Sequence, residues 1–210
     1  MRRGAIDHIV VTSPDLASGV EFVRRQLGVS PQPGGGHPQM GTHNCLLKLG
    51  ESVYLEVISP NPGAPSPGRP RWFELDQVKS PRLATWVART TDLHAAVAAS
   101  SESLGNIEPM SRDELNWLIT IPADGSLPFG GTAPALIEWK TQSHPATKLQ
   151  DAGCALVRLE AFHPEASRLS ALLRSISLQS EVTVSSLSPG SRPYLVARVR
   201  TPNGMKIIRP

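Results

Sequence analysis

The chain has 210 residues, of which 40% are hydrophobic and 19% are charged, enough for one large or two small domains with a real core. Its net charge is +3, and its lysines and arginines are scattered in runs no longer than a pair, so nucleic-acid binding is not expected. No segment is long enough to span a membrane, and two cysteines are too few for a disulfide framework. We therefore expect a cytoplasmic protein that handles a small molecule.

The first predicted unit, at about residues 4–62, begins with a strand and a helix. Ile6, His8 and Val10 share one face of the strand, and Asp7 is expected on the other face. An apolar stripe follows at helical spacing and ends at Gly28. After a Gly/Pro-rich loop or weak strand, two short apolar runs separated by "GES" predict a hairpin.

The same order returns later in the chain. Residues 80–143 again read as a strand, a capped helix and then strands, including "NWLITIP" and "PALIEWK". A third copy begins at "CALVRLEAFHPEASRL". Several strands follow each helix, which excludes a parallel doubly wound fold. We expect a paired domain over residues 1–150, followed by a third βα-strand unit over 151–210 that packs on the first two or makes a homodimer.

Several of these stretches resemble the sequences of a known protein family. "IDHIVV", "MGTHNCLLKLGESVYLEVISPNP", "ALIEW" and the third-unit start resemble the glyoxalase-like domain subgroup of the vicinal oxygen chelate superfamily, which includes glyoxalase I, extradiol dioxygenases and methylmalonyl-CoA epimerase. The resemblance implies an α+β fold of repeated βαβββ modules. Their curled mixed or antiparallel sheets would enclose a cavity, and a divalent metal would be held by residues of the first and last strands.

By position, the resemblance places the metal ligands at His8, Glu56 and Glu138, while the remaining place falls on or near Trp86, which cannot bind a metal. One imidazole and two carboxylates suit Zn, Ni, Mn or Fe and leave positions open for a substrate. Such a metal stabilises an enolate or oxyanion. Glu56 would then be tolerated in an apolar strand because it faces a wet cavity.

Proton transfer would fall to Glu138 or His43. Three roles are open for His43: a substitute for the missing ligand, a base in the cavity, or a cap on the loop. Asn44, the next residue, is expected to point away from the cavity.

Three further side chains are candidates for the cavity. His37, in the glycine-rich loop, could close over a ligand. Trp86 and Trp139 lie on predicted strands and would form either core or cavity wall.

Three functions are compatible with this pattern. The first is a metal-dependent lyase or isomerase that acts on a small oxygen-rich metabolite. The second is a non-catalytic module that binds and sequesters a small molecule without metal. The third is an extradiol dioxygenase, which expects two histidines and one carboxylate, so that His43 would have to join His8.

Overall fold

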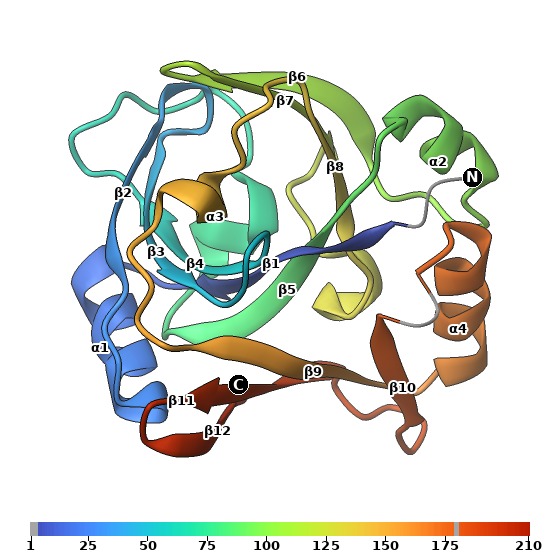
Figure 1. Cartoon of the computed structure of the whole chain (residues 1–210). Helices are drawn as coiled ribbons and strands as arrows, with labels where there is room; N and C mark the ends of the chain where they lie inside the picture. The colour runs from blue at the N-terminus through green and yellow to red at the C-terminus, as the bar shows by residue number, and fades with distance from the viewer. Residues whose placement is uncertain (1–3, 179–180) are drawn as a thin grey trace.

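The computed structural model describes residues 4–178 and 181–210 (Figure 1). The first module is a βαβββ unit. Its second strand is the glycine-rich stretch that the sequence marks only weakly, and it ends at His37. The elements are β1 (Ala5–Thr12), α1 (Leu16–Leu27), β2 (Gln32–His37), the 3-10 turn η1 (Pro38–Met40), β3 (Thr42–Lys48) and β4 (Tyr54–Pro60).

The second module repeats this order and includes a strand that the sequence pattern did not reveal, β6. Asp15 and Asp92 cap the helices of the two modules by accepting backbone N–H groups of the first turn. The elements are η2 (Trp72–Gln77), β5 (Arg82–Arg89), α2 (Leu93–Ala99), β6 (Asn106–Arg112), β7 (Leu115–Ile121), η3 (Pro128–Gly131) and β8 (Ala135–Trp139).

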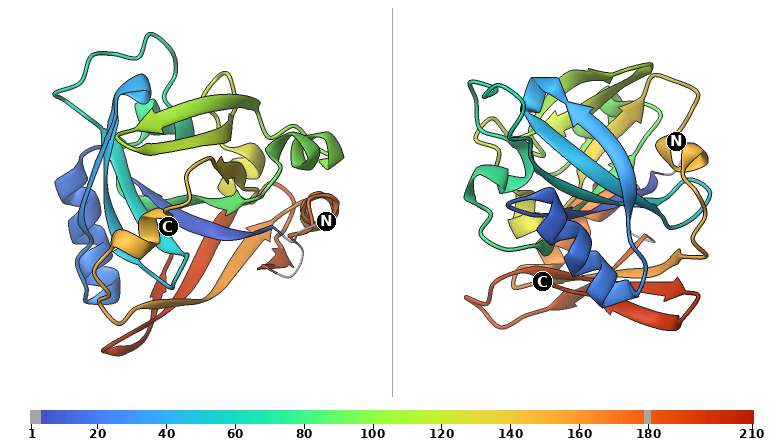
Figure 2. Two further views of the ribbon diagram at one scale, coloured as in Figure 1. Left: turned by 45° about the horizontal axis from the view of Figure 1, so that its top comes forward. Right: turned by 90° about the vertical axis from the view of Figure 1, so that its left-hand side faces the viewer.

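The two modules share one eight-stranded sheet in the order β2-β3-β4-β1-β5-β8-β7-β6. An antiparallel pairing of β1 with β5 joins them at the centre, and each of these strands pairs in parallel with the last strand of its own module. The sheet curls until its two edge strands, β2 and β6, lie side by side (Figure 2). This architecture confirms the predicted α+β fold of βαβββ modules around a cavity.

The third module forms a separate four-stranded sheet, in the order β10-β9-β11-β12. One face of this sheet joins the same apolar core as Ile9 and Trp86, so it backs the central strands of the larger sheet. Because this packing occurs within one chain, the expected homodimer stays a prediction. The elements are β9 (Ala155–His163), α4 (Ala166–Ser175), β10 (Val182–Ser186), β11 (Tyr194–Thr201) and β12 (Gly204–Ile208), and the short helix α3 (Pro145–Lys148) precedes them.

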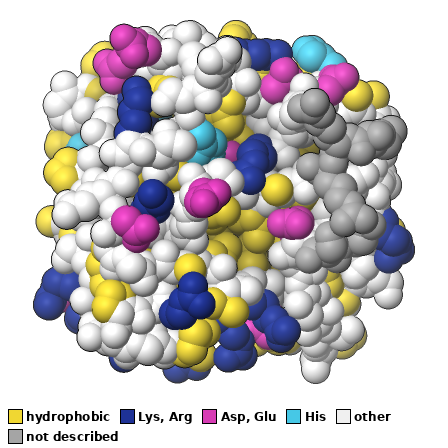
Figure 3. Space-filling view, viewed as in Figure 1, with side chains coloured by type: hydrophobic (Ala, Val, Ile, Leu, Met, Phe, Trp, Pro, Cys, Tyr) yellow, Lys and Arg dark blue, Asp and Glu magenta, His cyan; other side chains and the backbone are white. Residues whose placement is uncertain are grey.

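The surface shows no single dominant charge on the face drawn in Figure 3, where basic and acidic side chains are interspersed with apolar ones. Among the residues that the structure describes, none of the helices has the length and apolar character needed to cross a bilayer.

Candidate functional site

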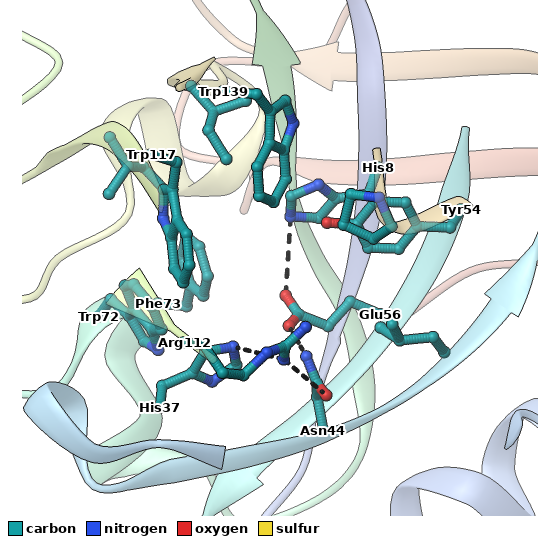
Figure 4. Close-up of a pocket in the computed structure, with 14 residues that line it drawn as sticks. His8, His37, Asn44, Tyr54, Glu56, Trp72, Phe73, Arg112, Trp117 and Trp139 are labelled. Carbon is teal, nitrogen blue, oxygen red and sulfur yellow. Dashed lines mark hydrogen bonds and ion pairs between the residues drawn. The ribbon is translucent and has the colours of Figure 1, made fainter. Parts of the chain in front are cut away.

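A pocket lies inside the curl of the larger sheet and is lined by side chains from both modules (Figure 4). It has a polar part and an aromatic part. Its free space is about 30 Å³, roughly the volume of one or two water molecules. The polar lining residues are His8, His37, Asn44, Glu56 and Arg112, and the aromatic ones are Tyr54, Trp72, Phe73, Trp117 and Trp139.

A β-bulge in β1 places a buried carboxylate behind the first histidine. Ile6 pairs with Ala88 and His8 with Val87, so Asp7 is an extra residue with no partner on β5. Its Oδ1 lies 2.7 Å from His8 Nδ1, although regular alternation predicted the two side chains on opposite faces. That expectation was wrong because the bulge interrupts the two-residue period at this residue.

The bulge determines which nitrogen of the His8 ring donates a hydrogen bond to Asp7. Burial alone would raise the pKa of Asp7, but hydrogen bonds from His144 and His8, together with their charges, outweigh burial and hold this pKa well below its usual range. Asp7 is therefore a carboxylate that can only accept hydrogen bonds. His8 Nδ1 must carry the proton, and Nε2 is left to face Glu56 Oε2 at 3.6 Å.

Glu56 is held in place from β3. Its Oε1 accepts a hydrogen bond of 2.6 Å from Asn44 Nδ2, while Asn44 Oδ1 accepts one of 2.8 Å from the backbone N–H of Gly35. These two contacts fix which end of the Asn44 amide faces the carboxylate. Asn44 thus points into the pocket, the reverse of our expectation. His43 points to the opposite face of β3, which does not suit the two of its three expected roles that need the cavity.

Arg112, at the end of β6, reaches across the closed edge of the sheet. Its Nη1 lies 3.3 Å from His37 Nε2 and 3.5 Å from Asn44 Oδ1. Burial lowers the pKa of His37 to about 4, so this ring is neutral near pH 7. The neutral ring accepts from Arg112 at Nε2 and donates through Nδ1 to Thr42 Oγ1 at 3.0 Å. His37 therefore lies in the pocket, whereas Arg112 was missed because no local pattern marks it.

Aromatic rings form the remaining walls. Tyr54 stacks on His8 with ring centroids 4.5 Å apart, and the rings of Trp117 and Trp139 are 5.5 Å apart. Trp139 Nε1 also donates to Asp7 Oδ2 at 2.9 Å, which ties the wall to the buried carboxylate. Phe73 adopts a left-handed backbone conformation, with φ of 59°, which is uncommon for a residue with a side chain.

Besides His43, two predicted residues do not reach the pocket. Glu138 accepts the backbone N–H of Leu93 at 2.9 Å and pairs with Lys140, so it lies at the start of α2 on the far face of β8. Trp86 is fully buried in the core, where its Nε1 donates to the carbonyl of Thr132 at 2.9 Å. Its assignment to the cavity wall was wrong.

The expected set of metal ligands is therefore not assembled. Of His8, Glu56 and Glu138, only the first two share the pocket, and a third nearby nitrogen, His37 Nε2, faces the guanidinium of Arg112. Within residues 4–178 and 181–210, no three His, Cys, Asp or Glu side chains are placed to hold a metal ion. This donor set does not fit a divalent centre with three protein ligands.

Several solved structures show a distant similarity to this chain. Methylmalonyl-CoA epimerase, solved with methylmalonyl-CoA and NH4+, is 19% identical with a TM-score of 0.46 over 68% of this chain and 99% of that one. The epimerase from Mycobacterium tuberculosis is 15% identical, with a TM-score of 0.40 over 64% and 86%. A mutant of 4-hydroxymandelate synthase from Streptomyces coelicolor is 16% identical, with a TM-score of 0.48 over 100% and 63%.

Structural similarity at such low sequence identity is not evidence for a shared function. The search of curated protein sequences found no match. The family model described as "Glyoxalase-like domain" matches residues 6–177, which is most of the chain. The chain therefore belongs to the glyoxalase-like domain family.

Proposed function

We propose that this protein is an isomerase or lyase that moves a proton at a carbon next to a carbonyl group in a small metabolite. One observation carries the proposal: His8 Nδ1 donates to the buried carboxylate of Asp7, so Nε2, which faces Glu56 in the pocket, is the nitrogen at which the neutral ring accepts a proton. A histidine held in this way by a carboxylate is the usual arrangement of a general base.

The surrounding groups support a proton-transfer cycle. When His8 takes a proton from the substrate, its ring becomes a cation between the carboxylates of Asp7 and Glu56. Both carboxylates stabilise that cation. Asn44 fixes Glu56 through the 2.6 Å hydrogen bond, so the glutamate keeps its position while the charge on His8 changes. The protonated His8 ring then returns its proton to the substrate, and Glu56 stays a carboxylate throughout.

The divalent metal expected from the sequence has no part in these steps. Glu138 faces α2. The third nitrogen near His8 and Glu56 is His37 Nε2, which accepts a hydrogen bond from Arg112. Catalysis in the proposed reaction therefore rests on side chains alone.

Hydrogen–deuterium exchange in small oxo acids tests the proposal. Pyruvate and phenylpyruvate are incubated with the protein in D2O, and loss of the signal of the C–H next to the carbonyl is followed by NMR. We expect exchange above background with the wild-type chain and a loss of roughly 10²- to 10⁴-fold in His8→Gln. His94→Gln is the matched control, because His94 is exposed on α2.

Two results would contradict the proposal. One is exchange at the wild-type rate in His8→Gln when thermal unfolding shows that the variant is folded. The other is binding of the oxo acids without any exchange, which would favour the non-catalytic binding module. Metal is tested separately: addition of Mn²⁺ or Zn²⁺ to chelator-treated protein should raise the melting temperature no more in wild type than in His8→Gln.

A further inference from the structure

The pocket contains a cationic group, the Arg112 guanidinium, to which the proposed proton transfer at His8 gives no role. We propose that the substrate carries a single carboxylate that binds the guanidinium of Arg112, attached to a flat apolar body that lies against the tryptophan walls. This inference rests on the proposed function and names the substrate class for the same site.

Arg112 differs from the arginines that form ion pairs. Its side chain is partly buried, and the groups that it contacts are both neutral: the His37 ring at 3.3 Å and the Asn44 amide oxygen at 3.5 Å. Within the described part of the chain, no carboxylate lies within ion-pair distance of it. Several other arginines do have a carboxylate partner: Arg24, Arg69, Arg71, Arg82, Arg168 and Arg198.

The nearest pocket carboxylate, Glu56, makes no ion pair with Arg112 among the described residues, and Asn44 contacts both groups. Asn44 donates through Nδ2 to Glu56 and turns its oxygen to Arg112 (Figure 4). The pocket therefore has a negative end at Asp7, His8 and Glu56 and a positive end at Arg112. A ligand that matches both ends places an anion at Arg112 and its proton-bearing carbon at His8.

The geometry of the positive end favours a carboxylate. A guanidinium presents a planar fork that binds the two oxygens of a carboxylate in parallel. One nitrogen of the Arg112 fork is engaged with His37, which aims the group without neutralising it. A ligand with two negative charges would meet the carboxylate of Glu56 without a second cation to offset it, so we expect a monoanion.

The body of the ligand is defined by the aromatic walls. Trp72 and Phe73 stack with ring centroids 5.5 Å apart, and the rings of Trp117 and Trp139 lie at the same spacing. Flat unsaturated groups gain contact area and ring–ring attraction in such a site. The expected substrate class is thus an aryl- or alkenyl-substituted monocarboxylic acid.

Isothermal titration with a matched pair of probes tests this inference. Cinnamate and cinnamamide have the same flat body and differ in charge. We expect the wild-type chain to bind cinnamate roughly ten- to hundredfold more tightly than the amide, the range for hydrogen bonds to a charged group. Arg112→Gln should abolish the preference, and Arg112→Lys should keep only part of it. Arg158→Gln, at an exposed arginine of β9, should leave it unchanged.

The inference is overturned if the wild-type chain binds both probes equally, if it binds neither at millimolar concentration, or if Arg112→Gln keeps the preference. Arg112→Lys covers the case in which Arg112→Gln does not fold. The failure of the proposed function is seen separately. A kept carboxylate preference without proton exchange in wild type would refute only the reaction. Exchange that depends on His8 but shows no preference for the carboxylate would refute only this inference.

Discussion

Asp7→Asn is the most direct test of how the bulge in β1 prepares His8. The carboxylate accepts three hydrogen bonds: from His8 Nδ1 at 2.7 Å, Trp139 Nε1 at 2.9 Å and His144 Nε2 at 3.0 Å. Two of these donors cannot reverse their role. Trp139 has only a donor, and His144 Nδ1 already accepts the backbone N–H of Ala146, so its proton stays on Nε2.

An amide at this position has one accepting oxygen, and we expect it to face Trp139 and His144. Its NH2 group then faces His8 Nδ1, so the His8 ring must move its proton to Nε2. Three charge-assisted hydrogen bonds become neutral ones, each weaker by roughly 1 kcal/mol, while the neutral amide costs less to bury. We expect a net loss of about 1–3 kcal/mol in the free energy of unfolding. Proton exchange should fall by roughly 10²- to 10⁴-fold, because Nε2 can no longer accept.

Three measurements on Asp7→Asn check this reasoning. Urea unfolding at pH 7 gives the stability change, ¹⁵N NMR of the histidine rings reports which nitrogen of His8 carries the proton, and oxo-acid exchange reports activity. Because the pKa of Asp7 is lowered, the stability that its charge contributes is present above about pH 4 and is lost on further acidification. The variant should lack that loss. An unprotonated Nε2 in the variant, with exchange within about one order of magnitude of wild type, would refute the proposed role of the bulge.

Further outcomes follow from the other side chains. Glu138→Gln should lower the free energy of unfolding by about 0.5–1.5 kcal/mol, because it weakens the hydrogen bond to the Leu93 N–H. The rate of proton exchange should not change, and a loss of exchange would show that Glu138 takes part in the reaction. Glu56→Gln should reduce exchange while the fold, followed by circular dichroism, is retained, and an unchanged rate would exclude Glu56 from the reaction. Since burial lowers the pKa of His37 to about 4, the unfolded chain alone binds this proton between about pH 6.5 and 4. His37→Gln should therefore remove about 1.4 kcal/mol per pH unit of acid destabilisation in that window, which urea midpoints at several pH values would show.

The repeat and the fold class could be predicted from the sequence because periodic apolar residues record which face of each element is buried. The inward direction of Glu56 was also predictable, since an acid in an otherwise apolar strand needs a polar surrounding. The weak β2 and the unmarked β6 escaped because their sequences, "QPGGGH" and "NIEPMSR", show no clear alternation.

The site errors share a physical cause, the phase of the two-residue period. The motifs around Glu56 and Glu138 look equivalent, but in β8 it is Ile137 and Trp139 that face the pocket, so the acid between them turns away. A slip of one residue moves every side chain to the other face of a strand. In β3 the same one-residue error placed His43 rather than Asn44 among the pocket candidates.

The remaining site residues depend on contacts that no short stretch of sequence records. The bulge at Asp7 follows from the pairing of β1 with β5, about eighty residues later in the chain. Arg112 reaches His37 from the other module, a separation of 75 residues. Such residues are found only when the closed sheet brings its two edges together.

That closed edge also indicates how a ligand enters. The strands that carry His8 and Glu56 lie inside the hydrogen-bonded ladder, and the smaller sheet backs their outer face. By contrast, β2 and β6 are the two edge strands of the sheet. Arg112 of β6 contacts His37 of β2, and the backbone N–H of Ser111 donates to the Gln39 side chain just after β2. Local opening is easiest where no ladder must break. We therefore expect amide hydrogen exchange to be fast at this seam and slow in β1, so that an incoming acid meets the guanidinium before it reaches the base.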